Sequence, residues 1–134
     1  MIKDELRKAH RALQTAKVNL NAGDGAASVN RTYYAMYYAA RAMLMNAGAD
    51  VPKTHSALIG DFSRRFVESG LLTRQLGRDF NKVEEQRRYA DYIADEDIPL
   101  DVASELLDKA VAFVDAIAAH LNRETDPDSG RPLK

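Results

Sequence analysis

The chain has 134 residues, of which 46% are hydrophobic and 29% charged, and its formal net charge at pH 7 is -1. This length suits one domain with its own core. The absence of cysteine excludes disulfides, thiol catalysis and cysteine-ligated metal sites. The nearly neutral charge argues against a broadly basic nucleic-acid binder and leaves open a local basic face.

Membrane and export signals are missing from the sequence. No apolar run approaches the roughly 20 residues that a membrane-spanning helix needs. The charged start, Met1-Ile2-Lys3-Asp4-Glu5, is unlike a secretory signal. We therefore expect a cytoplasmic location and no membrane partner.

The first half of the chain predicts two long helices. One is expected over about residues 3–21, where leucine recurs every seven residues with alanine between. Gly23-Asp24-Gly25 interrupts this pattern. A second helix, over about residues 25–47, is expected to end at Gly48, a residue suited to a left-handed C-cap.

Two threonines are expected to begin the next helices. Thr54 suits the N-cap of a helix that closes at Gly70, and Thr73 that of a helix reaching about Ala90. Residues 91–98 are acidic and lack a helical pattern. We expect an irregular connection there.

Pro99 suits the first turn of a last helix, with Asp101 and Glu105 near its start to complement the helix dipole. The final stretch, residues 123–134, is polar with two prolines, and we expect a disordered tail. No segment shows strand alternation. The prediction is an all-α, up-and-down four-helix bundle with an additional short helix, formed by residues 1–122.

Four of the six tyrosines fall within six residues of the second expected helix, in pairs one turn apart. So many rings on one helix cannot all stay in water, so they must pack against neighbours. Arg31 and Arg41 flank them as candidate partners for the hydroxyls. The wide apolar arc of this helix favours a symmetric homodimer with the helix at or near the contact between subunits. The alternative is that the whole apolar arc is buried inside the bundle of a single chain. The tyrosines are Tyr33, Tyr34, Tyr37 and Tyr38.

Motifs for cofactor or metal chemistry are also missing. Gly23-Asp24-Gly25 is too short for a phosphate-binding loop, and no HExxH spacing occurs. His10, His55 and His120 lie on different segments, and we interpret each as structural. His55, directly after Thr54, is expected to be a surface or capping residue. We expect no bound cofactor and no metal site.

A second polar group lies near the end of the fourth expected helix, in residues 84–92. Arg87 and Asp91 are one turn apart and can pair, while Tyr89 and Tyr92 lie on a neighbouring face. Such an arginine can grip a phosphate of a nucleotide or RNA, because its guanidinium matches phosphate oxygens bidentately. The alternative, favoured by spacing alone, is an ion pair that secures the helix end.

A basic stripe precedes that group on the same expected helix. Arg74, Arg78 and Lys82 are spaced four residues apart. Acidic residues are interspersed with them, so we interpret the stripe as a solvated helix face.

Three segments together resemble the HEPN family (higher eukaryotes and prokaryotes nucleotide-binding domain), specifically its small stand-alone prokaryotic members. They are NRTYYAMYYAA at residues 30–40, KTHSAL at 53–58 and RRYADY at 87–92, and the likeness covers about residues 4–122. The resemblance implies an up-and-down helical bundle that commonly dimerises. It also implies a partner, since similar proteins are often encoded beside a minimal nucleotidyltransferase and act with it as a toxin–antitoxin-like module.

The resemblance further implies a site. Many HEPN proteins are metal-independent ribonucleases in which an arginine is followed, after four to six residues, by a histidine that serves as acid or base. Arg87 fits the arginine, and Tyr92 stands in the histidine's place. Tyrosine, with an ordinary pKa of about 10, is a poor base at neutral pH.

The resemblance to the HEPN family also implies which residues form the site. The candidates for binding nucleotide or RNA are Arg87, Arg88, Asp91 and Tyr92, and Arg87 and Tyr92 are the catalytic candidates. In some such pairs the transferase adds adenylate to a tyrosine near the motif, which makes Tyr92 and Tyr89 candidates for modification.

Three functions stay open, in order of preference. The first is a dimeric nucleotide- or RNA-binding module with a nucleotidyltransferase partner. The second is a metal-independent ribonuclease with a noncanonical site. The third is a structural helical adaptor in which the tyrosine helix serves only dimerisation.

Overall fold

The computed structural model describes residues 1–92 and 97–125. Within those ranges the chain is helical, without any strand, which confirms the all-α prediction. The elements are α1 (Ile2–Asn21), α2 (Gly25–Asn46), α3 (His55–Phe62), the short π-helical segment η1 (Ser63–Val67), α4 (Arg74–Tyr92) and α5 (Leu100–Thr125).

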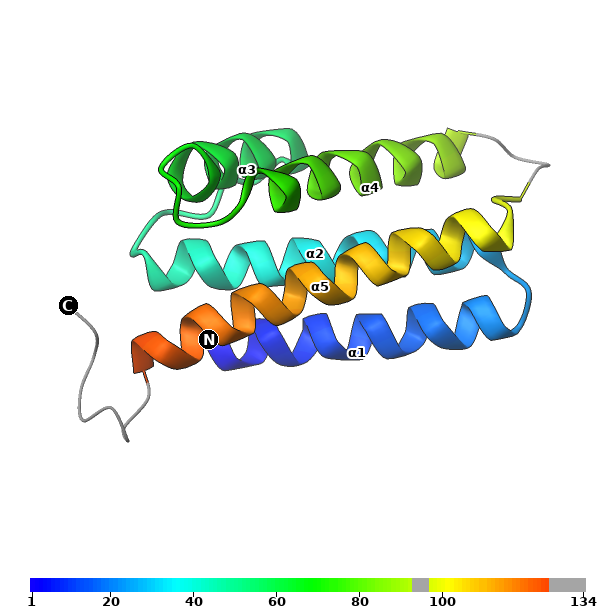
Figure 1. Cartoon of the computed structure of the whole chain (residues 1–134), viewed down its shortest axis with the longest axis horizontal. Helices are drawn as coiled ribbons and strands as arrows, with labels where there is room; N and C mark the ends of the chain where they lie inside the picture. Colours follow the sequence, from blue (N-terminus) through cyan, green and yellow to red (C-terminus); the bar gives the residue numbers. More distant parts are fainter. Residues whose placement is uncertain (93–96, 126–134) are drawn as a thin grey trace.

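The second helix is the centre of the bundle. It packs against α1, α3, α4 and α5, and α1 and α4 lie on opposite sides of α2 and α5 (Figure 1). Small buried side chains such as Ala35, Ala39 and Ala42 let these neighbours approach closely. The wide apolar arc of the tyrosine helix is therefore used largely inside one chain.

Aromatic packing joins α3 and η1 to the helices that follow them. The ring of Phe80 lies 4.9 Å from that of Phe113 and 5.5 Å from that of Phe62, centroid to centroid. Phe66, in η1, adds its ring 5.3 Å from Phe62. Edge-to-face and tilted contacts of this kind add about 0.5–1.5 kcal/mol per pair beyond area burial.

Helix ends lie close to the predicted positions. The Thr54 side chain accepts a hydrogen bond from the Ala57 N–H and caps α3. Gly48 and Gly70 adopt φ of 74° and 86°, the left-handed conformation that glycine favours after a helix. The stretch after Thr54 is divided, however, since α3 is followed directly by the π-helical turn η1.

Two predicted ends fall short of the observed ones. α4 runs to Tyr92 rather than about Ala90, and α5 runs to Thr125 rather than Asn122. The rest of the predicted tail, residues 126–134, and residues 93–96 of the acidic connection lie outside the described residues.

A carboxylate before α5 fastens the start of α2. Asp97 accepts hydrogen bonds from the backbone N–H groups of Gly25, at 3.1 Å, and Ala26, at 2.5 Å. These bonds lower the pKa of Asp97, the Ala26 bond most. Helix N-termini attract anions in this way, so a distant segment supplies part of the cap for α2.

Candidate functional site

Arg87, on α4, lies at the centre of a group of polar and aromatic side chains. Its Cζ sits 4.6 Å from the ring centroid of Tyr33 on α2. Its two terminal nitrogens meet Asp91 at 2.8 Å and Glu84 at 3.4 Å. The Arg87–Asp91 pair that the spacing allows is therefore present.

Burial differs sharply within this group. The Arg87 side chain is 14% exposed, whereas that of Asp91 is 53% exposed. The Nε of Arg87 is buried without a hydrogen-bond acceptor in the described part of the chain. An unpaired buried donor is costly. Glu84 and Tyr33 fix the inner side of the guanidinium, and the outer partner, Asp91, is the one a ligand can replace.

His55, the first residue of α3, joins the same group through Tyr33. Its Nδ1 lies 2.9 Å from the Tyr33 hydroxyl oxygen. Its ring stacks on that of Tyr37, with centroids 4.8 Å apart. The histidine interpreted as a surface or capping residue is thus packed between tyrosines, next to the arginine. We call Tyr33, His55, Glu84, Arg87 and Asp91 the Arg87 cluster.

Proton affinities in the cluster follow from burial and charge. Burial raises the pKa of Tyr33 well above its ordinary value, and Arg87 only partly offsets this. Burial also lowers the pKa of His55, and the positive charge of Arg87 lowers it further. At neutral pH Tyr33 therefore keeps its proton and His55 is uncharged. An uncharged imidazole can accept or donate a proton.

The remaining tyrosines extend the cluster along α2. Tyr37 lies 6.1 Å from Tyr33 between ring centroids. Cations cover the outer rings: Arg41 stands 5.9 Å from the centroid of Tyr37, and Arg31 stands 4.9 Å from that of Tyr34. Both arginines lie near ring centroids, and their expected role as partners of the hydroxyls stays a prediction.

Three other predicted site residues lie away from the cluster's centre. Arg88 is 63% exposed and pairs with Glu84 at 2.7 Å. Tyr89 and Tyr92 are 50% and 88% exposed. Neither of these two rings contacts a described aromatic or cationic side chain. The part that Tyr92 and Tyr89 take in the site therefore stays a prediction.

Several other basic residues form ion pairs. Arg64 and Arg65 both pair with Asp61, and Lys82 lies 3.8 Å from Glu105. Among the described residues, no group of three histidine, aspartate or glutamate side chains is placed to hold a metal ion. No described helix is long and apolar enough to cross a membrane.

His55 is the residue that reasoning from periodicity missed. Its position after a helix cap predicts a surface role, because nothing local shows that α3 folds back onto α2. The only available signal was its place inside the KTHSAL segment that resembles the HEPN family.

Comparisons with known proteins agree on one family. A family model described as "HEPN domain" matches residues 2–121. A "UPF0332 protein" of Thermotoga maritima is 33% identical over 111 residues, which cover 83% of each chain. The "Putative toxin MJ0142" of Methanocaldococcus jannaschii is 28% identical over 87% of this chain and 78% of its own length.

A solved structure shows the same fold. The crystal structure of an archaeal HEPN homologue superposes with a TM-score of 0.68, covering 90% of this chain and 97% of that chain at 15% sequence identity. The match over residues 2–121 includes every helix that builds the Arg87 cluster. The chain belongs to the HEPN domain family.

Proposed function

We propose that this chain is a dimeric module that binds a phosphate of a nucleotide or RNA at the Arg87 cluster, in a toxin–antitoxin-like pair with a nucleotidyltransferase. The observation that carries the proposal is the position of Arg87, which Glu84 and Tyr33 hold from inside and which half-exposed Asp91 pairs with on the outside. A relative named as a toxin supports the biological setting.

Binding would proceed by exchange of anions. A phosphate that displaces Asp91 replaces one acceptor of Arg87 by another with more oxygens. The ring of Tyr33 contacts the guanidinium before binding, so the Arg87 side chain loses little entropy when a ligand binds. The exposed Arg88 adds charge beside the entry side.

The nucleotidyltransferase partner is supported by a different feature. Tyr89 and Tyr92 expose their rings at the end of α4, one to four residues from Arg88. Their hydroxyls are accessible to a second enzyme, whereas that of Tyr33 is bonded inside the cluster. We propose Tyr92 and Tyr89 as the acceptors of an adenylate group. The dimer rests on the family resemblance.

The test is binding of AMP and of a labelled oligouridylate in EDTA, with fluorescence anisotropy for the RNA. Arg87→Lys keeps the positive charge and loses the planar fork, so we expect its affinity to fall about ten- to a hundredfold, the value of one charged hydrogen-bonding group. Arg78→Lys, on the same helix and bonded to Gln75 alone among the described residues, is the matched control and should bind like the parent. If folded Arg87→Lys binds with the same affinity as the parent, the proposed site is contradicted. Light scattering on the same samples measures the molecular mass and so tests the dimer.

A second function, metal-independent RNA cleavage, is supported by His55. The uncharged imidazole of His55 and the guanidinium of Arg87 both contact Tyr33. The imidazole can act as a base, and the guanidinium can bind a phosphate. Cleavage in EDTA should then disappear in His55→Gln and Arg87→Lys and persist in Tyr92→Phe. No cleavage by the parent would leave binding alone, and cleavage that persists in His55→Gln would exclude His55 as the base.

A further inference from the structure

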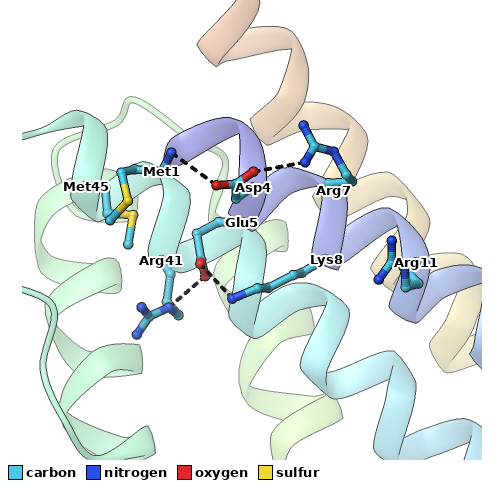
Figure 2. A pocket seen from close by; sticks show the side chains of 8 residues that line it. All are labelled: Met1, Asp4, Glu5, Arg7, Lys8, Arg11, Arg41 and Met45. Atoms are coloured by element: carbon cyan, nitrogen blue, oxygen red, sulfur yellow. Dashed lines mark hydrogen bonds and ion pairs between the residues drawn. The ribbon is translucent and has the colours of Figure 1, made fainter.

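A second set of cations lies on the outer surface of α1 and α2, where the function proposed above does not use it. Lys8 and Arg11 project from α1, and Arg31 and Arg41 from α2; we call these four the α1–α2 basic face. Two hollows, of about 460 and 300 Å³, share Lys8 and Arg11 in their walls. Figure 2 shows the larger one, with Lys8 and Arg41 converging on one carboxylate and Arg11 further along α1.

The carboxylates near this face do not neutralise it. Buried Glu5 accepts hydrogen bonds from Arg41 at 2.7 Å and Lys8 at 3.3 Å. Its neighbour Asp4 is occupied by Arg7 and by the N-terminal ammonium group. One carboxylate thus serves two cations on the face.

Arg11 and Arg31 are left with excess charge. In the described part of the chain neither forms an ion pair with a carboxylate, and the only side-chain hydrogen bond of Arg31 goes to neutral Asn30, at 3.3 Å. The whole chain carries a net charge of -1, so this concentration of positive charge is local. Surplus cations gathered along one face are the electrostatic footprint of a polyanion site.

Tyrosine rings lie between these cations. Lys8 stands 5.8 Å from the ring centroid of Tyr38, and Arg31 stands 4.9 Å from that of Tyr34. Both rings are half-buried, so part of each still faces outward. A single-stranded nucleic acid presents phosphates and flat bases in alternation and can use both features. An acidic peptide would use the charge alone.

The face is also continuous with the Arg87 cluster. Arg41 covers Tyr37, whose ring stacks on His55 at 4.8 Å and neighbours Tyr33 at 6.1 Å. The row of tyrosines on α2 therefore joins the two regions.

We infer that a single strand of RNA lies along the α1–α2 basic face, with phosphates on Arg11 and Arg31 and bases against the tyrosine row, and reaches the Arg87 cluster at its end. The inference rests on the proposed function for that last contact only. Arg11 and Arg31 are the best probes, because neither supports the fold through an ion pair among the described residues.

The experiment measures affinity for a fluorescein-labelled oligouridylate of about 12 nucleotides, within the usual range of single-strand site sizes, between low and physiological salt. The Arg11→Gln/Arg31→Gln double variant removes two phosphate contacts. We expect a loss of roughly tenfold near physiological salt and a decrease of about 1.4 in the slope of log affinity against log salt concentration. Arg74→Gln/Arg78→Gln carries the same charge change on α4 and should match the parent.

The outcomes separate this inference from the proposed function. If the double variant binds like the parent while Arg87→Lys binds weakly, the basic face is not the RNA track and the Arg87 site stands. If the double variant binds weakly and Arg87→Lys binds normally, the track stands without the proposed site. Equal losses in both double variants would show a general charge effect, and a fall in molecular mass in Arg11→Gln/Arg31→Gln would show a subunit contact; either result overturns the inference.

Discussion

At the scale of single residues, Tyr33 organises the candidate site. Its ring is fully buried, its face is covered by Arg87 and its hydroxyl meets His55. Desolvation keeps that hydroxyl protonated, so the ring holds a cation and a neutral imidazole without itself carrying charge. The guanidinium of Arg87 and the imidazole of His55 are therefore both positioned by contacts with Tyr33.

The charge state of His55 yields a prediction for stability. Burial and Arg87 lower its pKa in the folded chain below the ordinary 6.5, so the unfolded chain binds a proton more tightly. The contribution of neutral His55 is complete above pH 6.5 and is lost as pH falls through the lowered pKa. Unfolding free energy should therefore fall more between pH 7 and 5 in the parent than in His55→Gln. Denaturant titrations at each pH measure this, and parallel curves for the two proteins would contradict it.

At the scale of elements, the start of α2 is fixed by a segment far along the chain. The Asp97 carboxylate accepts hydrogen bonds from the first N–H groups of α2. The Ile98 carbonyl lies so close to Gly25 that a Cβ atom added at Gly25 would overlap it. The same helix carries the four tyrosines and packs against α4 and α5.

A pair of glycine substitutions tests that contact. Gly25→Ala should lower the free energy of unfolding by about 1–3 kcal/mol, because the added methyl group meets backbone that cannot move aside easily. Gly60→Ala is the control, since the space around it within α3 is open, and it should stabilise by about 0.5–1 kcal/mol. Thermal or urea unfolding gives both values. A neutral Gly25→Ala would show that the approach of Ile98 is loose in solution.

At the scale of the whole molecule, the helices could be predicted from short sequence patterns. The arrangement of the site residues depends on tertiary contacts between helices. Caps and glycines such as Thr54 and Gly48 are local, so helix ends could be read from the sequence. The packing of His55 onto Tyr33 depends on how α3 folds across α2, which no local pattern encodes. Tyr92, assigned to the site by the resemblance of the RRYADY segment, is 88% exposed, and its role stays a prediction.

The proposed function depends on contact between Arg87 and the phosphate of a bound ligand. The most direct measurement follows the side-chain Nε–H resonance of Arg87 by NMR while AMP or an oligouridylate is added, with the signal assigned from its loss in Arg87→Lys. We predict that this resonance shifts and saturates at the affinity found by anisotropy, because a phosphate that replaces Asp91 changes the charge and hydrogen bonding of the guanidinium to which Nε belongs. Saturable binding that leaves the Arg87 resonance unmoved would contradict the claim.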